Sequence, residues 1–326
     1  MPNRLGVEWI GAIDGGGTKT ASALLSSEGE LITLPIAGGC NPQDNRSWEM
    51  ELEQVMVHLL SSQPGLRAVT MGMPGFGEVR ELDRAVSALV TSGMGRIGFI
   101  RNDVEMAFHG AFPDGNGLLL LAGTGSMAIA GEASDITRVG GWGDTFGDEG
   151  SGYWIGRQAL GLASRELDGR LPATGFAESL CAALDLSLER DPLVLMGWAA
   201  RQSHARSAIA SLARIVDAFA KGGDARAIDL LQEAARYMAE HYAAGVKKGG
   251  LTADAPWATA GSVFLSSIVI DAVSERIGHP PVNATLPPIG GGLLLAARQA
   301  GWAADAAFIE NLSRQLQLAP LSHKRT

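Results

Sequence analysis

The apolar residues near the start of the chain follow the period of strands around a glycine-rich turn. Residues 8–34 read EWIGAIDGGGTKTASALLSSEGELITL, with apolar stretches broken first by glycines and then by SSEGE. After the glycines, small polar and apolar residues alternate over residues 19–25, as they do in a strand. A dinucleotide fingerprint or a P-loop needs a helix directly after its turn, and Thr18 precedes Lys19, so G-K-[ST] is absent. The pattern predicts a meander of strands with a tight turn over residues 15–18.

The rest of the chain alternates between helical and strand patterns and becomes mainly helical after Trp154. Trp48 and Leu52 share one face of an apolar stripe at helical spacing. Strands are expected at residues 66–73 and 96–103, and helices at 46–60, 81–90, 104–112, 155–167, 175–184, 192–200, 207–220 and 225–246. Residues 256–264 and 286–301 are each typical of a strand or loop that enters a helix, the second with three glycines before its helix. The alternation predicts the α/β class.

A second hairpin repeats the design of the first. Residues 118–132 read LLLLAGTGSMAIAGE, again with apolar strands on both sides of a glycine turn. Aligning the two stretches superposes three pairs of residues, namely Gly15 on Gly123, Gly17 on Gly125 and Thr18 on Ser126. Two such hairpins in one chain predict duplicated halves, each of which presents a phosphate-binding turn to a common cleft.

The turns offer bare backbone N–H groups, which attract phosphate oxygens. Taken alone, the first turn is equally typical of a plain glycine-rich hairpin, and its repetition favours the phosphate interpretation. Asp14 ends the first strand and would lie close to the phosphates. A carboxylate there needs a cation to offset it, and Mg²⁺ held through water is the usual solution.

Asp103 stands where the strand of residues 96–103 meets the next helix. On local grounds it is a simple N-cap, worth about 1 kcal/mol. The carboxyl ends of strands in open α/β sheets also carry ligand-binding groups, which favours a functional role for the same side chain.

The segment GGWGDTFGDEGSGYW, residues 140–154, combines glycines, acids and tryptophans. Glycine concentrates where backbone turns tightly or approaches a ligand. A phosphate cradle, a metal loop and a site for a neutral polar ligand such as a sugar are the candidate interpretations. The D-x-[DN]-x-[DN]-G spacing of a calcium loop is absent.

Composition narrows the class of protein. The 326 residues predict two domains, and the formal charge of −9 without a basic stripe argues against nucleic-acid binding. Cys40 and Cys181 form no C-x-x-C pair, so neither a disulfide framework nor a thiolate metal site is indicated. The uncharged runs are too rich in glycine and polar residues to span a membrane, and Asp14 interrupts the first apolar segment, so no signal peptide is expected. We expect a cytoplasmic enzyme with no membrane partner.

Together these motifs resemble the sugar kinase, Hsp70 and actin superfamily, and within it the N-acetylglucosamine kinase and BadF/BadG/BcrA/BcrD-type ATPases. The resemblance covers nearly the whole chain: DGGGTKT is similar to phosphate motif one, AGTGS to phosphate motif two, and AGSVF with PPIGGG to the adenosine region. Its most specific part is GGWGDTFGDEGSGYWIG, which is similar to the family's G-G-W-G-x-x-x-G-D-E-G-S-x-Y-W-I segment. The fold implied is the two-domain actin-like ATPase fold, with duplicated ribonuclease H-like halves around a nucleotide cleft.

The resemblance also implies roles for individual residues. The sugar would be bound by Asn41, Gly141, Trp142 and Asp148, and Asp103 would bind it and act as the catalytic base. Charged acceptors hold sugar hydroxyls strongly, so a carboxylate in such a wall is chemically sensible. The roles of Glu149, a candidate helix N-terminal carboxylate, and of Asp144 stay open. ATP would contact Gly15, Gly16, Gly17, Thr18, Lys19, Gly123, Thr124, Gly125, Ser126, Gly261, Ser262 and Gly291, with Mg²⁺ near Asp14.

The metal sites that different subfamilies of this superfamily need distinguish between them. Iron–sulfur activators and zinc-containing ROK kinases need cysteine ligands, which Cys40 and Cys181 do not supply as a motif. A kinase is therefore favoured, in which Asp103 accepts a proton from a sugar hydroxyl that attacks the γ-phosphorus of ATP. The family implies N-acetylglucosamine and its 6-hydroxyl. A kinase of glucosamine or another hexosamine, and an ATPase switch that acts on a partner protein, remain alternatives.

The same resemblance suggests a domain plan. Residues 1–113 are expected to form an N-terminal sugar- and phosphate-binding domain, with a C-terminal helix near 303–320 packed back on it. Residues 114–302 are expected to form a larger nucleotide-binding domain. A homodimer is expected.

Overall fold

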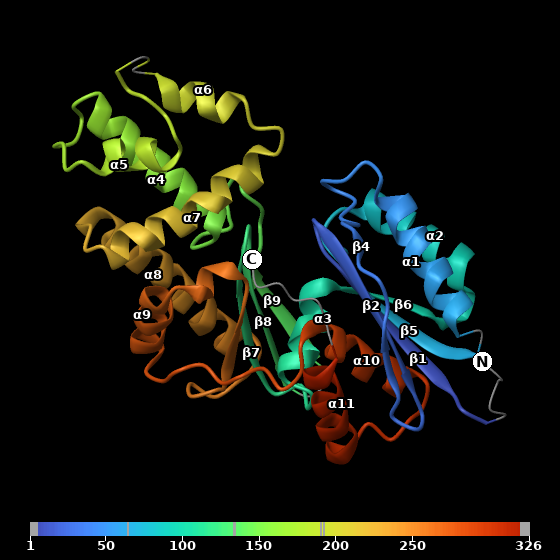
Figure 1. The fold of residues 1–326 in the computed structure, drawn as a ribbon. Helices are drawn as coiled ribbons and strands as arrows, with labels where there is room; N and C mark the ends of the chain where they lie inside the picture. Colours follow the sequence, from blue (N-terminus) through green and yellow to red (C-terminus); the bar gives the residue numbers. More distant parts are fainter. Residues whose placement is uncertain (1–5, 64, 133–134, 190, 192, 320–326) are drawn as a thin grey trace. The chain divides into compact units, whose positions relative to one another are not determined.

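The computed structural model describes residues 6–63, 65–132, 135–189, 191 and 193–319. The described chain forms two compact units (Figure 1). Unit 1 contains the residues up to Gly115 together with those from Asn283 onward, and unit 2 runs from Asn116 to Val282. The sequence predicts the second boundary at residue 302, whereas in the structure it lies after Val282. The difference arises because the helix of residues 288–299 packs on the first strand of unit 1.

Unit 1 is built on a sheet in the order β3-β2-β1-β5-β6, with β4 paired to β2. β1, β2 and β3 are antiparallel neighbours, whereas β5 and β6 run parallel to β1. The strand, turn, strand pattern predicted from residues 8–34 is confirmed. The strands are β1 (Trp9–Gly15), β2 (Lys19–Ser26), β3 (Leu31–Thr33), β4 (Ala37–Gly38), β5 (Leu66–Met73) and β6 (Gly98–Asn102).

Helices of unit 1 contribute to two separate cores, on opposite sides of β1. Side chains alternate along a strand, so Trp9 and Ile13 pack in a core with α1, while Ile10 and Ala12 pack in another with α10 and α11. The helices are α1 (Trp48–Ser62), α2 (Arg80–Met94), the 3₁₀ turn η1 (Gly95–Ile97), α3 (Asp103–Ala111), α10 (Pro288–Gln299) and α11 (Ala306–Leu318).

The three glycines of residues 290–292 lie inside α10, so the prediction that they precede a helix is wrong. A Cβ added to Gly291 would lie 2.1 Å from the Met106 carbonyl oxygen and 2.6 Å from the Gly110 nitrogen, both in α3. Small residues are needed because α10 and α3 approach each other closely. Helix packing therefore explains Gly291, and its expected contact with ATP has no glycine turn to support it.

Unit 2 repeats the sheet of unit 1 in shorter form. Its order is β10-β7-β8-β9, with β7, β8 and β9 antiparallel and β10 parallel to β7. The succession β5-β1-β2-β3 in unit 1 has the same directions, which confirms duplicated halves. The strands are β7 (Gly117–Ala122), β8 (Ser126–Glu132), β9 (Asp135–Gly140) and β10 (Trp257–Ala260).

The remaining described part of unit 2 is helical. Gly156 permits a close approach between two helices, because a Cβ there would lie 1.9 Å from the Ile209 carbonyl oxygen of the neighbouring helix. The helices are α4 (Gly152–Leu167), α5 (Phe176–Ala183), α6 (Val194–Ala200), α7 (Ala205–Lys221), α8 (Ala225–Lys248), the 3₁₀ turn η2 (Ser262–Leu265) and α9 (Ser267–Ile277).

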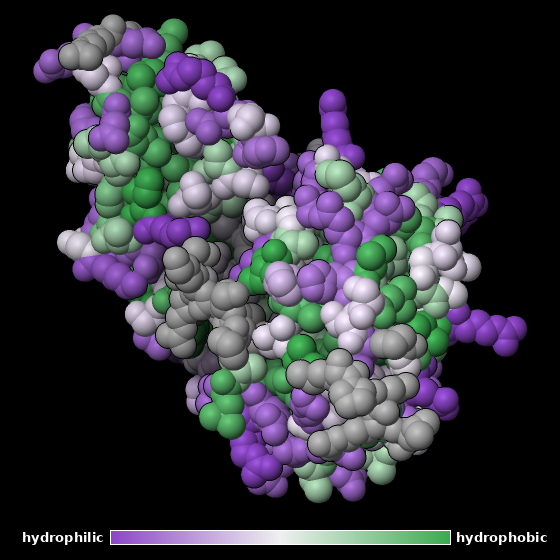
Figure 2. Space-filling model, turned by 45° about the vertical axis from the view of Figure 1, so that its right-hand side comes forward, coloured by the Kyte–Doolittle hydropathy of each residue, from purple (hydrophilic) through white to green (hydrophobic). Residues whose placement is uncertain are grey.

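The surface is mixed, and the face drawn in Figure 2 shows hydrophilic residues interspersed with apolar ones. Leu193 and Met196, next to and within α6, are 62% and 69% exposed. Among the described residues, no helix has the length and apolar character that crossing a membrane requires.

Candidate functional site

The first glycine turn closes the β1–β2 hairpin under a second stretch of backbone. β1 ends at Gly15 and β2 begins at Lys19, so residues 16–18 form the turn. The Cys40 N–H donates to the Gly16 carbonyl at 3.0 Å, and a Cβ on Gly39 would lie 2.1 Å from the Gly17 oxygen. The segment after β4 therefore lies directly against the turn.

Glycine occupies the positions of this turn for different physical reasons. A Cβ on Gly15 would lie 2.6 Å from Cys40 Sγ and 2.7 Å from the Gly72 oxygen, so internal packing requires glycine there. At Gly17 a Cβ would meet nothing within 4 Å, and φ is not positive. Neither packing nor backbone conformation demands glycine at Gly17, whose bare backbone suits the close approach of a ligand.

Two carboxylates flank one glycine at the carboxyl ends of three neighbouring strands. Asp14 on β1 pairs with Gly72 on β5, and Gly72 pairs in turn with Arg101 at the end of β6. A Cβ on Gly72 would lie 3.2 Å from the Cα of Asp103. The absence of a side chain at Gly72 thus lets Asp103 lie close to β5, on the other side from Asp14.

The Asp14 carboxyl is surrounded by protein, and its pKa is raised from 3.8 to about 7. Burial is the largest cause, the negative charge of Asp103 adds to it, and Lys19 opposes it. Desolvation and a like charge both disfavour an ionised carboxylate. A cation bound at Asp14 would relieve both effects.

Asp103 is the first residue of α3, and the N-cap is Asn102. The Asn102 side chain accepts a hydrogen bond from the Val104 N–H at 2.9 Å, and Asp103 Oδ1 lies 3.0 Å from the same nitrogen. The simple N-cap interpretation of Asp103 is therefore wrong, because its neighbour caps the helix.

Asn41 follows the segment that covers the first turn. Its Oδ1 accepts from the Gln43 N–H at 3.0 Å, and its Nδ2 donates to Asp44 Oδ2 at 2.7 Å. The amide group is thus oriented by its own loop and is half-buried. Cys40 beside it is buried, and burial raises the pKa of its thiol.

The second glycine turn, residues 123–125, closes the β7–β8 hairpin in unit 2. A Cβ on Gly123 would meet nothing within 4 Å, as at Gly17 in unit 1. Thr124 is exposed. Gly261, at φ +97°, follows β10, and a Cβ there would lie 2.8 Å from the Gly123 nitrogen. The structure thus brings the end of β10, with Ser262 next in the chain, to the second turn.

Residues 141–151 connect the end of β9 at Gly140 to α4, and several residues of this region are left-handed. Gly140 and Gly141 have φ of +71° and +70°, and Arg138 donates to the Gly141 carbonyl. Trp142 is 72% exposed. Asp148 has a φ of +57°, which is rare for a residue with a side chain. This conformation turns a carboxylate that is only 3% exposed toward the second turn.

The contacts of Asp148 show what surrounds it. Its Oδ1 lies 3.4 Å from the Ser126 nitrogen, and its Oδ2 accepts from Arg206 Nη2 at 2.6 Å. The Ser126 hydroxyl donates to the Glu149 carbonyl at 2.8 Å. Arg206 also faces Asp144, with 3.8 Å between Nε and Oδ1.

Sequence reasoning missed Arg206, because one arginine on a helix of mixed polarity carries no signal of its contacts. It also left Glu149 as a candidate residue at the start of α4. The cap of α4 is Ser151, whose Oγ accepts from the Trp154 N–H at 3.0 Å.

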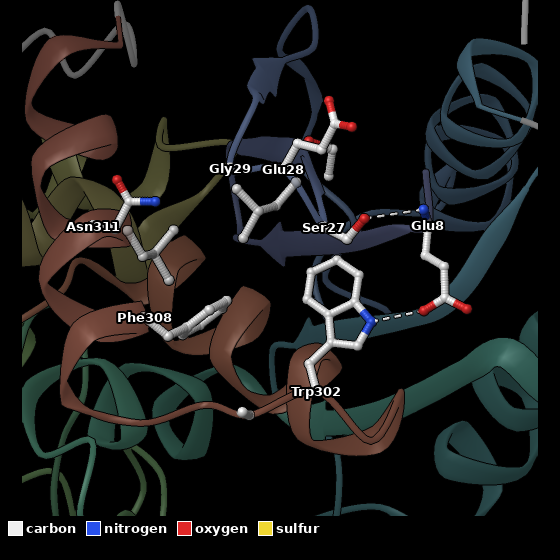
Figure 3. Close-up of a pocket in the computed structure, with 11 residues that line it drawn as sticks. Glu8, Ser27, Glu28, Gly29, Trp302, Phe308 and Asn311 are labelled. Atoms are coloured by element: carbon white, nitrogen blue, oxygen red, sulfur yellow. Dashed lines mark hydrogen bonds between the residues drawn. The ribbon is translucent and has the colours of Figure 1, made fainter. Parts of the chain in front are cut away.

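A pocket of about 440 Å³ opens elsewhere in unit 1 (Figure 3). It lies at the opposite end of the β1–β2 hairpin from the glycine turn, about 20 Å away along the strand. Trp302 Nε1 donates to Glu8 Oε2 at 3.1 Å, and the Glu8 N–H donates to Ser27 Oγ at 3.2 Å. These polar groups are hydrogen-bonded to one another. The pocket is separate from the candidate site.

Comparison with known proteins gives consistent results. The sequence model of the BadF/BadG/BcrA/BcrD ATPase family matches residues 11–296. An N-acetylmuramic acid/N-acetylglucosamine kinase of Clostridium acetobutylicum is 29% identical over 71% of this chain and 77% of its own. An N-acetyl-D-glucosamine kinase of Dictyostelium discoideum is 27% identical over 87% of this chain and 96% of its own.

Solved structures support the same fold. A candidate N-acetylglucosamine kinase of Chromobacterium violaceum superposes with a TM-score of 0.70 at 23% identity, covering 88% of this chain and 98% of that one. A second, from Porphyromonas gingivalis, has a TM-score of 0.63 at 22% identity, covering 89% and 98%. At these identities the likeness shows the fold.

Proposed function

Because the chain belongs to the BadF/BadG/BcrA/BcrD ATPase family, we propose that it is an ATP-dependent kinase that phosphorylates N-acetylglucosamine at the 6-hydroxyl. Two curated relatives that cover most of the chain are N-acetylglucosamine kinases, which supports the substrate class. The structural observation that carries the proposal is the position of Asp103. It lies near Asp14, which precedes the first glycine turn, and it starts α3 while Asn102 caps that helix.

Asp103 would act as the general base. Its carboxylate would accept the proton of the attacking hydroxyl, which makes that oxygen a better nucleophile for the γ-phosphorus. Asn41, oriented by its loop, would position the sugar, together with Gly141, Trp142 and Asp148. Exposed indoles present a flat apolar face, which suits the apolar face of a sugar ring.

The two glycine turns would bind the phosphates of ATP. Gly17 and Gly123 have open space where a Cβ would stand, so phosphate oxygens can approach the backbone of both turns. Gly15, Gly16, Thr18 and Lys19 complete the first turn, and Thr124, Gly125 and Ser126 the second. Gly261 and Ser262 would contact the adenosine. Gly291 does not enter this proposal.

The residues near Asp14 fit Mg²⁺. The Asp14 carboxyl has a raised pKa because it is buried beside Asp103 with only Lys19 in opposition, and a bound divalent cation removes that penalty. Among the described residues no group of three or more ligating side chains occurs. Mg²⁺ is commonly held by one or two carboxylates plus water and substrate phosphates, so Asp14 is sufficient as its protein ligand. When bound, Mg²⁺ neutralises charge on the phosphates.

A coupled assay of ADP release tests the proposal. The panel is N-acetylglucosamine, N-acetylmuramic acid, glucosamine, N-acetylmannosamine and glucose, each with ATP and MgCl₂. ADP release should rise by orders of magnitude with N-acetylglucosamine and match the sugar phosphate formed one for one. Without sugar, hydrolysis should be slow because no bound sugar hydroxyl is positioned at Asp103 for attack. A larger increase in ADP release with glucosamine than with N-acetylglucosamine would favour the alternative of a glucosamine kinase.

An ATPase switch would behave differently, since its hydrolysis would ignore every sugar and respond to a protein. No stimulation by any sugar of the panel would refute the kinase proposal. A cytoplasmic homodimer completes the proposal, and light scattering of the purified protein tests its mass.

A further inference from the structure

Arg206 lies against the second glycine turn. It is the second residue of α7, and its Nη2 donates to Asp148 Oδ2 at 2.6 Å. A Cβ added to Gly125 would lie 3.0 Å from the same Nη2 and 2.9 Å from Asp148 Oδ2. The guanidinium and the carboxylate therefore both touch the turn that would receive phosphates.

The helix that carries Arg206 does not explain it. A cation in the first turn opposes the helix dipole, and the first turn of α7 has no acidic residue and no side-chain cap. Arg206 Nε is buried without a hydrogen-bond partner among the described residues, with Asp144 Oδ1 at 3.8 Å. The favourable contact that offsets these costs is the bond to Asp148.

Asp148 in turn creates an electrostatic problem for a phosphate site. Its carboxylate is buried, its Oδ1 lies 3.4 Å from the Ser126 N–H, and its left-handed backbone holds it there. A carboxylate at this position occupies a donor of the turn and repels phosphate oxygens. Asp144 adds a second negative charge near the same guanidinium.

We propose that Arg206 is the counter-charge of the second phosphate turn, which holds and neutralises Asp148 so that the turn can accept the phosphates of a nucleotide. Arg206 is thus a positioning residue, acting through Asp148. The inference rests on the proposed function, because it takes ATP as the ligand of this turn. In this proposal, the second glycine turn can bind ATP beside Asp148 only while Arg206 is present.

Calorimetric titration of the full-length protein with ADP and MgCl₂, without sugar, tests the proposal. Arg206→Met keeps the apolar stem and removes the charge, so ADP affinity should fall about 10- to 100-fold, as for a lost charge-assisted interaction. Arg214→Met is the matched control, because Arg214 is an exposed residue of the same helix. Its ADP affinity should equal that of the wild type.

The double variant Asp148→Asn with Arg206→Met separates a counter-charge from a simple structural tie. If Arg206 neutralises Asp148, removing both charges should return ADP affinity to within about threefold of the wild type. Asp148→Asn alone should bind ADP at least as tightly as the wild type. If Arg206 only ties two elements together, the double variant will remain as weak as Arg206→Met, and the proposal is overturned.

Folding is checked by thermal denaturation of each variant. Should Arg206→Met not fold, Arg206→Lys provides the second measurement, because it retains the charge but not the forked geometry. ADP affinity within about fivefold of the wild type supports the counter-charge, and a larger loss overturns it. The kinase proposal fails separately: intact ADP binding without sugar-dependent turnover refutes the sugar, whereas wild-type affinity in Arg206→Met refutes only the counter-charge.

Discussion

Replacement of Asp103 by asparagine tests the proposed base with little disturbance of the fold. The change preserves size and removes one negative charge. The Val104 N–H keeps its acceptor on Asn102 at 2.9 Å, and an amide oxygen at position 103 can still approach it as Asp103 Oδ1 does at 3.0 Å. The free energy of unfolding should therefore change by less than about 1 kcal/mol.

The effect on turnover should be far larger. A positioned general base contributes about 10²- to 10⁴-fold, which corresponds to about 2.7–5.5 kcal/mol of transition-state stabilisation. ADP affinity should not weaken, since the lost charge is negative and acts on Asp14 at the proposed phosphate turn. Removing it should also lower the pKa of Asp14, because Asp103 is the second cause of its elevation.

The assay is ADP release at saturating ATP and N-acetylglucosamine, with thermal denaturation in parallel. Asp305→Asn is the matched control, because Asp305 is the N-cap of α11 in the same unit and accepts from the Phe308 N–H at 3.0 Å. The control should keep the wild-type rate. A wild-type rate in Asp103→Asn, or its failure to fold beside a folded control, would show that Asp103 is structural.

Three further predictions follow from the geometry. Asp148→Ala should raise the KM for the sugar by about 10-fold or more, as expected for a lost charge-assisted hydrogen bond, while ADP affinity is retained; a loss confined to the nucleotide would contradict the sugar role. Asp14 has a folded-state pKa of about 7 against 3.8 unfolded, so its contribution to stability is fully present below about pH 4 and is lost as the pH rises to 7. In metal-free urea titrations Asp14→Asn should therefore gain stability relative to the wild type by up to about 1.4 kcal/mol per pH unit across this window, and parallel curves would disprove the shift. Gly291→Ala should destabilise the protein by about 1–3 kcal/mol through overpacking of α3, whereas Gly123→Ala should leave the melting temperature nearly unchanged and weaken ADP binding; equal melting losses would contradict this division.

The hairpins were predictable because their signal is local. Alternation after the glycines and the absence of G-K-[ST] predicted a strand where a P-loop would have a helix, and the pairing of Gly15 with Thr20 confirms it. The repeat at Gly123 predicted duplicated halves in the same way. Both hairpins could thus be predicted from two similar stretches of sequence.

Other features depend on contacts between distant segments. The glycines around Gly291 look like a ligand-binding turn in sequence, but they lie within α10, where they permit the close approach of α3. The boundary near Val282 depends on which sheet α10 covers, and Arg206 depends on where α7 places its first turn. The residues that neighbour these features in sequence carry no pattern that reveals them. The contacting segment must therefore be known before a role can be assigned to the residue.

The split composition of unit 1 has a consequence for synthesis on the ribosome. The apolar core beneath Ile10 and Ala12 is completed by Leu293, Leu294 and Leu312, all of which leave the ribosome after the whole of unit 2. At about 5–20 residues per second, the first sheet waits on the order of 10–40 s with that face uncovered. During this interval the nascent sheet presents a surface for chaperones or for aggregation, while unit 2 can already fold. A ribosome stalled once Val282 has left it, but before Leu293 has, should therefore display a protease-resistant unit 2 behind a protease-sensitive N-terminal segment.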